Sequence, residues 1–258
     1  MRCAFTRAVS PRLADCALTH IKRVPINVAT ATAQHGEYER ALAEAGLEII
    51  RLPELPRDPD GVFVEDTALL LEEHAIITRP GAASRAHETS STEAGLSTRF
   101  RIHRVERGHL DGGDVLRIGK RLYVGLSTRT NIEGIEALAE LTAPLGFCVV
   151  KTELRQCLHL KTGATFAGPD AAGTPVLLYH ANSIDPRQFD GVQPIAVAVD
   201  EAAAANCVRA GDRLILPVGS PKTAETLRAR GFDVVEVDVS ELQKAEAGLT
   251  CMSLIDER

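Results

Sequence analysis

Amphipathic helical segments recur along the chain, and a short apolar stretch follows each of them. Residues 35–46, 131–146 and 220–231 place apolar side chains at helical spacing, and each segment ends in a glycine. The stretches LEIIRL, FCVVK and FDVVEVD follow in turn, and a fainter copy, TEAGLSTRF, precedes RIHRV. A terminal glycine suits a helix end because that position needs a positive φ. Ser220 and Pro221 are expected at the N-cap and the first helical position of the third helix.

Apolar runs broken by short turns fill the regions between these helices and predict β-hairpins. They are VFVEDTALLLEEHAIITRPG, GGDVLRIGKRLYVG, HLKTGATFAGPDAAGTPVLLYH and NCVRAGDRLILPVG. Gly119 marks the turn of the clearest hairpin. The C-terminal stretch CMSLI has no hairpin partner, so we expect it to pair with MRCAFTR near the N-terminus and close the structure.

A polar or thiol side chain opens each hairpin unit at a nearly constant interval. These residues are Asp66, Asp111, His159, Cys207 and Cys251, and subtracting their numbers gives separations of 45, 48, 48 and 44. A fixed period of this length indicates repeated structural units. Five units around an axis would bring the opening strands together at the centre and place distant residues in one pocket. The alternative is an ordinary α/β sheet in which the spacing carries no meaning.

Composition excludes several classes of protein. Of the 258 residues, 45% are hydrophobic and 25% are charged, which is typical of a globular protein. The 29 Lys and Arg against 35 Asp and Glu give a net charge of −6, which disfavours nucleic acid and anionic membranes as partners. Arginines interrupt the N-terminal segment, so it does not resemble a secretory signal, and no run is long enough for a transmembrane helix. Six cysteines without a C-x-x-C pair predict a reduced, cytoplasmic protein.

Cys251 and His159 are the candidates for nucleophilic chemistry. A lone cysteine is more often a buried core residue than a nucleophile, but Cys251 lies in the small-residue context GLTCMSL. A cysteine nucleophile needs a group that exchanges protons near neutral pH, and histidine does so. Asp111 is the candidate to orient that imidazole. The D-G-G turn could itself be purely structural, and Asp114, in the same LDGGD sequence, could equally be the structural carboxylate of the pair.

Acidic and basic side chains elsewhere suit an amino acid with a guanidinium group. Asp60, Glu65 and Asp66 follow one another closely in PDGVFVED, and paired carboxylates match the planar donors of a guanidinium. An exposed strand end is the simpler interpretation of these acids. Arg85 and Arg129 lie after predicted strands and together could bind an α-carboxylate, although each alone is typical of a surface charge.

Several motifs together resemble those of a known family. FVED, ITRPGAASR, LDGGDVL, STRTN, LHLK, AANC and LTCMS occur in the order and spacing of the dimethylarginine dimethylaminohydrolases, members of the guanidino-group-modifying pentein superfamily. The resemblance spans residues 5–255. It implies an α/β fold, a five-bladed α/β propeller with pseudo-fivefold symmetry, formed by residues 1–258 as a single catalytic domain.

The resemblance also implies roles for particular residues. Cys251 matches the nucleophile, His159 the general acid and base, and Asp111 the carboxylate that orients the histidine. The positions matching the family's substrate-binding residues are Leu18 and Ala245 through their carbonyls, Asp60, Glu65 and Asp66 through carboxylates, and Arg85 and Arg129 as a carboxylate clamp. The implied reaction converts a methylated arginine (asymmetric dimethylarginine or monomethylarginine) to citrulline and dimethylamine or methylamine, with no metal or organic cofactor.

Departures from the family pattern leave the preferred substrate open. Ala86 stands where family members often carry a second arginine, and Gly61 replaces the commoner serine. The sequence reads His159-Leu160-Lys161 where arginine deiminases carry H-x-D, so one side of a guanidinium lacks a second acid, which favours an N-alkylated substrate. Arginine or another guanidino compound is the alternative substrate, and a non-catalytic binding protein is the alternative class. Two further expectations are a homodimer formed through an exposed propeller edge and inhibition by zinc held by Cys251, His159 and Asp66.

Overall fold

Five small three-stranded sheets form the frame of the protein in a computed structural model that describes residues 2–258. In each sheet the inner pair of strands is antiparallel, and the middle and outer strands run parallel. From the inner to the outer strand, the sheets are β15 (Leu254–Asp256), β1 (Cys3–Thr6) and β2 (Glu48–Arg51); β3 (Ala68–Leu71), β4 (His74–Ile77) and β5 (Arg101–Arg104); β6 (Val115–Ile118), β7 (Arg121–Leu126) and β8 (Cys148–Glu153); β9 (Ala164–Pro169), β10 (Pro175–Tyr179) and β11 (Gln193–Ala196); and β12 (Val208–Ala210), β13 (Arg213–Pro217) and β14 (Asp233–Val237).

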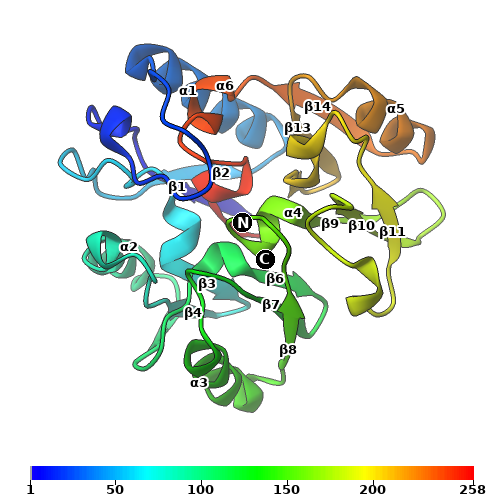
Figure 1. The fold of residues 1–258 in the computed structure, drawn as a ribbon. Helices are drawn as coiled ribbons and strands as arrows, with labels where there is room; N and C mark the ends of the chain where they lie inside the picture. The colour runs from blue at the N-terminus through cyan, green and yellow to red at the C-terminus, as the bar shows by residue number, and fades with distance from the viewer. Residues whose placement is uncertain (1) are drawn as a thin grey trace.

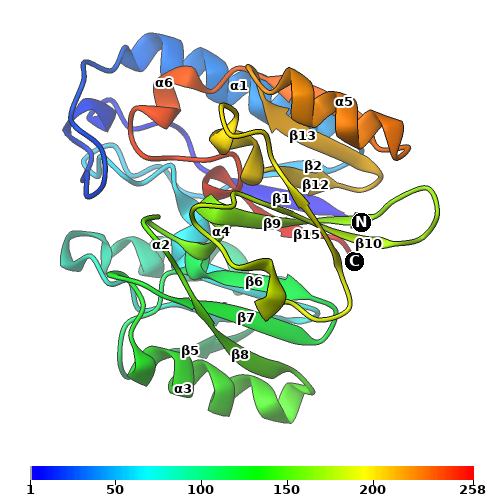
Figure 2. The ribbon, with the colours of Figure 1, turned by 45° about the vertical axis from the view of Figure 1, so that its right-hand side comes forward.

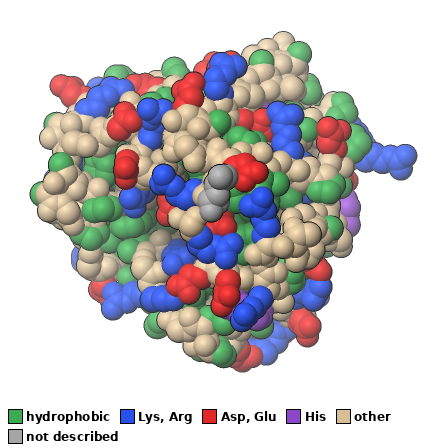
Figure 3. Space-filling model, turned by 180° about the vertical axis from the view of Figure 1, so that it is seen from behind, with side chains coloured by type: hydrophobic (Ala, Val, Ile, Leu, Met, Phe, Trp, Pro, Cys, Tyr) green, Lys and Arg blue, Asp and Glu red, His purple; other side chains and the backbone are tan. Residues whose placement is uncertain are grey.

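The five sheets stand around a central axis like the blades of a propeller (Figure 1). Residues of all five inner strands line a central cavity of about 550 Å³, which confirms that the opening strands meet at the centre. Figure 2 shows the sheets from the side, with the longer helices on the outside of the molecule. On the face opposite to that of Figure 1, side chains of both charges surround the centre (Figure 3).

Four blades carry a helix between the middle and outer strands. These helices are α1 (Val28–Glu44), α2 (Glu88–Leu96), α3 (Ile132–Thr142) and α5 (Pro221–Ala229). Gly46, Gly146 and Gly231 follow α1, the α3 region and α5 with φ of 87°, 79° and 86°, as the sequence predicted. The first helix begins seven residues earlier than residue 35, where the Asn27 side chain caps it by accepting from the Thr30 amide.

The blade of β9 to β11 differs from the expected repeat. Its middle and outer strands are connected by a single short turn, η6 (Pro186–Gln188), among the described residues, and no longer helix stands there. The other helices pack apolar faces on their own sheets, as when the fully buried Leu138 of α3 joins Leu122 and Val124 of β7 in one cluster. The core is therefore divided into several clusters around the axis.

The two ends of the chain close the ring. β15 pairs antiparallel with β1, with Phe5 opposite Leu254, so the predicted pairing of CMSLI with the N-terminal stretch is confirmed. No helix among residues 2–258 is long and apolar enough to cross a membrane.

The polar and thiol residues that open the five hairpin units lie in tight turns just before the inner strands. Asp66 lies in η2 (Val64–Thr67), Asp111 precedes η4 (Gly112–Asp114), and His159 precedes α4 (Leu160–Gly163). Cys207 follows η7 (Ala202–Ala205), and Cys251 lies in η8 (Thr250–Met252). The expectation that VFVED and Cys251 belong to strands was wrong, because these segments turn at the end of the axis before strand pairing begins.

Helix α5 is capped from outside its own sequence. Ser220 is the N-cap residue and Pro221 the first helical residue, as predicted, but the Ser220 side chain makes no capping hydrogen bond. Instead, the buried Glu201 carboxylate accepts from the amides of Lys222 at 2.9 Å and Thr223 at 2.8 Å. A carboxylate satisfies these free amides and complements the positive end of the helix.

We predict that Glu201→Ala lowers the free energy of unfolding by about 1–2 kcal/mol, since it removes both capping bonds. Urea unfolding followed by circular dichroism measures the effect. Ser220→Ala is the matched control and should change stability by less than about 0.5 kcal/mol. A larger loss for Ser220→Ala than for Glu201→Ala would contradict this assignment of the cap.

Candidate active site

Turns from four blades bring most of the predicted site residues into one small cavity. The cavity measures about 30 Å³ and lies where the inner strands begin. Its lining combines carboxylates, guanidinium groups, an imidazole and a thiol. The predicted residues among those that line it are Asp60, Asp66, Arg85, Arg129, His159, Ala245 and Cys251.

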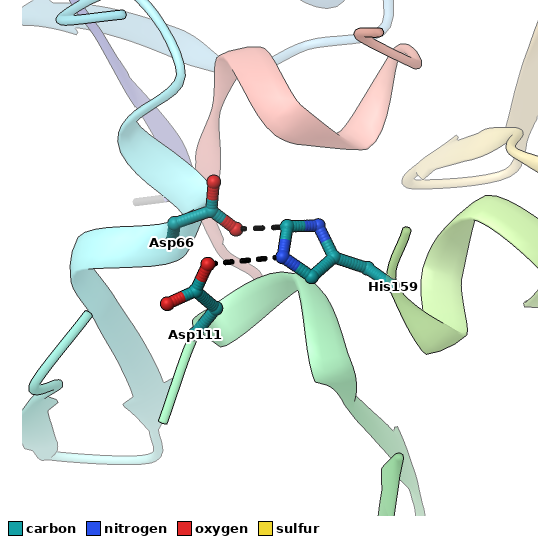
Figure 4. A group of neighbouring side chains, drawn as sticks. All are labelled: Asp66, Asp111 and His159. Atoms are coloured by element: carbon teal, nitrogen blue, oxygen red, sulfur yellow. Dashed lines mark hydrogen bonds and ion pairs between the residues drawn. The ribbon is translucent and has the colours of Figure 1, made fainter. Parts of the chain in front are cut away.

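Two carboxylates approach the His159 imidazole, one toward each ring nitrogen (Figure 4). Its Nε2 is 3.0 Å from Oδ2 of Asp111, and its Nδ1 is 3.8 Å from Oδ1 of Asp66. All three side chains are buried. The arrangement fixes the plane of the ring and leaves its Nδ1 edge on the side of Asp66.

The two candidate carboxylates of LDGGD have separate contacts. Asp111 reaches the imidazole, and its other oxygen accepts from the Gly81 amide at 2.8 Å. Asp114 instead accepts from the Leu160 amide at 3.0 Å and from the Ser127 hydroxyl at 2.6 Å. Burial raises the pKa of Asp114 to about 6. Asp114 therefore anchors the turn that carries His159, while Asp111 contacts the ring itself.

A close backbone approach holds Asp66 beside the imidazole. The Gly113 amide donates to Oδ1 of Asp66 at 3.1 Å, and Arg85 donates to Oδ2 at 2.5 Å. A Cβ on Gly113 would lie 2.7 Å from both Oδ1 of Asp66 and Nδ1 of His159. A larger residue at position 113 would therefore push these two groups apart.

Electrostatic contacts set the protonation of His159. Burial alone would lower its pKa, but the charge of Asp66, the hydrogen bond to Asp111 and the charge of Asp114 raise the pKa from 6.5 to about 9. Burial opposes the ionisation of Asp66, yet His159 and Arg85 hold the pKa of that carboxyl below its usual value. The imidazole is therefore protonated at neutral pH.

Cys251 reaches the cavity with 8% of its surface exposed. Its Sγ accepts from the Gly248 amide at 3.4 Å. Burial raises the pKa of the thiol, and the charges of Glu65 and Asp66 raise it further. Because the thiolate is the nucleophilic form, a cation bound in the cavity would activate this sulfur by offsetting the acids.

Glu65 and Leu18 differ from the sequence expectation, since neither is among the residues that line the small cavity. The Glu65 carboxylate lies 2.6 Å from Nζ of Lys161 and accepts from the Thr250 hydroxyl at 2.7 Å. These three side chains line the central cavity instead. A buried carboxylate needs a cation and hydrogen-bond donors, and Glu65 finds both in Lys161 and Thr250. Ala17, the neighbour of Leu18, lines the small cavity in its place.

The two arginines differ in how many of their donors are already bound. Arg85 is buried and donates to Asp66, to Glu88 and to the Phe63 carbonyl, which uses most of its N–H groups. Arg129 donates to the Thr19 hydroxyl at 3.0 Å and lies 3.9 Å from Asp111. Arg129 therefore keeps more of its donors for a ligand.

No family model matches the chain. A dimethylarginine dimethylaminohydrolase from Pseudomonas aeruginosa is 38% identical to it over 230 residues, covering 88% of each protein. Another from Streptomyces coelicolor is 38% identical over 254 residues, covering 97% of this chain and 95% of the relative. The chain belongs to the dimethylarginine dimethylaminohydrolase family.

Solved structures of this family share the fold. The P. aeruginosa dimethylarginine dimethylaminohydrolase, as a cysteine-to-serine variant complexed with citrulline, has a TM-score of 0.92 at 34% identity and 98% coverage of both chains. A histidine-to-glycine dimethylarginine dimethylaminohydrolase in an adduct with S-methyl-L-thiocitrulline has a TM-score of 0.91 at 35% identity, also at 98% coverage of both chains. The N-terminal domain of ArgZ, at 21% identity, matches with a TM-score of 0.84. The predicted five-bladed pentein propeller is confirmed.

Sequence reasoning missed the residues that cover the dimethylarginine dimethylaminohydrolase site. The carboxylate of Glu246 accepts from the amides of Thr19, His20 and Ile21, and Glu246 itself adopts a φ of 60°. The Ala17 amide is 3.2 Å from a carboxylate oxygen of Asp60. Nothing in the local sequence distinguishes Glu246 from a surface acid, because its partners lie more than 200 positions away.

A metal ion is a further ligand to consider at the site. Asp66, Asp111 and His159 each place one candidate ligand atom within 4.8 Å of the others. The sequence had suggested Cys251, His159 and Asp66 as zinc ligands. The set in the structure contains Asp111 where that expectation had Cys251. A metal ligand must be a neutral imidazole, and the raised pKa of His159 opposes that form at neutral pH.

We predict that the charge on His159 stabilises the fold at neutral pH and that this contribution is lost in alkali. The pKa is raised from 6.5 to about 9 on folding, so the contribution is complete below 6.5 and disappears as the pH rises through 9. Over that interval, the unfolding free energy of the wild type should fall by roughly 3 kcal/mol more than that of His159→Gln. Urea titrations of both proteins at several pH values measure this difference in unfolding free energy. Parallel curves for the two proteins would disprove the assignment.

Proposed function

We propose that this protein hydrolyses an N-methylated arginine to citrulline and the corresponding methylamine through a covalent intermediate on Cys251. One observation carries the proposal: the Cys251 thiol and the His159 imidazole share a cavity, and two carboxylates flank the imidazole. Membership of the family and the citrulline complex of a relative support the same reaction. We assign residues 1–258 as one catalytic unit.

Substrate contacts follow from the charges in the cavity. Asp66 is the carboxylate beside Cys251 that we assign to the guanidinium, and Arg129, supported by Arg85, is assigned to the α-carboxylate. We assign Asp60 and the carbonyl of Ala245 to the α-amino group of the substrate. Leu18, also assigned to the α-amino group, joins this set once its segment rearranges.

The segment around Ala17 to Ile21 has to move before a substrate enters. The cavity has room for only a few water molecules, whereas pockets for small ligands measure some 300 Å³ or more. That segment is held by the carboxylates of Glu246 and Asp60 and by Arg129. Two of these, Asp60 and Arg129, are residues that we assign to the substrate, so a bound amino acid competes directly with the covering segment.

The first chemical step forms the bond between sulfur and carbon. The cationic guanidinium offsets the charges of Glu65 and Asp66, so the Cys251 thiol releases its proton to solvent as substrate binds, and the thiolate attacks the guanidinium carbon. His159 is protonated at neutral pH and supplies the proton that the departing methylamine needs. The carbon–nitrogen bond breaks, and a thiouronium intermediate remains on the sulfur.

The second step returns the enzyme to its starting state. The imidazole, now neutral, accepts a proton from a water molecule as the oxygen attacks the same carbon. Collapse of this adduct breaks the carbon–sulfur bond and releases citrulline, and the remaining proton of the added hydroxyl passes to the Cys251 sulfur, which restores the resting thiol. Asp111 keeps the ring in place through both steps, because its 3.0 Å bond to Nε2 leaves Nδ1 as the edge that exchanges protons.

Lys161 supports a preference for methylated substrates. It pairs with Glu65 and keeps that carboxylate on the side of the central cavity. Asp66 then remains as the acid in the small cavity that we assign to the guanidinium. We propose that Glu65 acts through Thr250 and does not contact the substrate directly. A methylated nitrogen has fewer hydrogens to donate than an unmethylated one. A methylated guanidinium therefore forgoes few hydrogen bonds in a site that lacks a second acid.

Two expectations beyond the reaction are part of the proposal. We place the protein in the cytoplasm, since all six cysteines are free and four of them are buried, which suits a reducing compartment. We also propose a homodimer formed through an outer blade edge. Size-exclusion chromatography with light scattering would test the dimer.

The direct test is a substrate panel. We expect asymmetric dimethylarginine and monomethylarginine to yield citrulline with dimethylamine and methylamine, and arginine to react at least about tenfold more slowly in kcat/KM. Citrulline is measured by colour reaction and the amine by chromatography. Faster turnover of arginine would shift the assignment to a deiminase, and the absence of citrulline from every substrate would refute a hydrolase.

We predict that Cys251→Ser keeps the fold and loses at least about 1000-fold in kcat, because a serine hydroxyl ionises too weakly to replace the thiolate. Cys207→Ser is the matched control, since Cys207 is a buried cysteine at the equivalent opening position of another blade. That control should keep kcat within about threefold. Equal losses in the two variants would remove the special role of Cys251.

A further inference from the structure

We propose that Asn206 is a positioning residue that holds Cys251 at a fixed place relative to His159. The inference rests on the proposed function, because it concerns the same nucleophile. Asn206 is 4% exposed and stands at the opening of the blade of β12 to β14. That opening turn supplies none of the described side chains that line the small cavity. Its contribution to the site is therefore indirect.

The Asn206 amide joins the two turns that carry the reacting groups. Its Oδ1 accepts from the Thr250 amide at 2.9 Å, and its Nδ2 donates to the Lys161 carbonyl at 2.8 Å. Thr250 directly precedes Cys251, and Lys161 lies two residues after His159. One rigid planar group thus spans the distance between the nucleophile turn and the imidazole turn.

A closed ring of side chains completes this connection. The Nδ2 of Asn206 also lies 3.0 Å from the Thr250 hydroxyl, which donates to Glu65 at 2.7 Å. Glu65 pairs with Nζ of Lys161 at 2.6 Å, and the Lys161 carbonyl returns to Asn206. Each partner is next to, or two positions from, a residue of the site. The ring of hydrogen bonds therefore fixes the turns that carry Asp66, His159 and Cys251 relative to one another.

Gly248 adds a second contact between Asn206 and the nucleophile turn. A Cβ at position 248 would lie 2.3 Å from Cγ of Asn206, so the amide plane packs directly on this glycine. The Gly248 amide donates to Sγ of Cys251 at 3.4 Å. Asn206 thereby contacts the turn at two points just before Cys251, Gly248 and Thr250.

This geometry matters for rate more than for binding. The attack needs the sulfur aligned with the guanidinium carbon while His159 faces the leaving nitrogen, and small displacements of reacting groups are costly. The groups that we assign to the substrate, Asp66, Asp60 and Arg129, do not contact Asn206 in the described structure. Loss of Asn206 should therefore lower kcat and leave KM nearly unchanged.

The test compares Asn206→Ala and Asn206→Asp with Asn131→Ala. Asn206→Asp keeps the shape but loses both N–H donors. Asn131 caps α3 by accepting from the amides of His109 and Gly134, each at 2.9 Å, and lies outside the residues lining either cavity. Asn131→Ala thus removes a comparable pair of bonds elsewhere. Thermal unfolding verifies that each variant is folded. If Asn206→Ala does not fold, the comparison rests on the isosteric Asn206→Asp.

Two rates are measured for each protein: turnover of asymmetric dimethylarginine and alkylation of Cys251 by chloroacetamidine. Both Asn206 variants should lose about 100-fold in kcat and in alkylation rate, with KM changed by less than about threefold. Asn131→Ala should keep both rates within about twofold at a similar loss of thermal stability. Asn206 variants that retain half of the wild-type rates, or that lose no more than Asn131→Ala, would overturn the inference.

The two proposals can fail separately. If the wild type forms no citrulline, the proposed function fails, and the alkylation rate alone still shows whether Asn206 positions the thiol. If the wild type is active and the Asn206 variants match it, the positioning role fails and the proposed function remains.

Discussion

Buried charges that must be balanced within a few ångströms govern the organisation of this protein. His159 stands between the carboxylates of Asp111 and Asp66, and Arg85 neutralises the far side of Asp66. None of these groups is exposed enough for water to screen it, so neighbouring side chains must compensate its charge. The backbone amides of Gly113 and Leu160 complete the balance by donating to Asp66 and Asp114.

The propeller supplies this balance by repeating one backbone arrangement five times. Each blade begins with a tight turn at the axis; two of these turns carry a carboxylate, and the other three carry an imidazole, an amide and a thiol. Short inner strands keep the turns close together, while the longer helices remain outside (Figure 2). A pocket built in this way draws on residues separated by nearly the whole chain, and no single segment can form it alone.

The resting state of the site is closed and weakly nucleophilic. Burial and, after it, the neighbouring acids raise the pKa of the Cys251 thiol and keep it protonated, and the segment near Thr19 is bonded to Glu246 and Arg129. A cationic amino acid reverses both conditions under the proposed function, because its guanidinium offsets the acids and its carboxylate replaces the contacts of Arg129. Electrostatic complementarity thus links substrate entry to activation of the nucleophile.

The sequence alone determined the repeat, the helix ends, the closing pair of strands, and Cys251 and His159 as partners, because spacing and local patterns encode these features. Only the tertiary structure shows that Asp114 anchors the turn of His159 while Asp111 contacts the imidazole, and that Glu65 is bound by Lys161 and Thr250. It also decided that Glu201 caps α5 in place of Ser220, and that Asn206 contributes at a position where the repeat had indicated Cys207. Each of these choices depends on hydrogen-bond distances between segments that are far apart in the sequence. A pattern along one chain segment carries no information about such distances, since packing of the whole ring sets them.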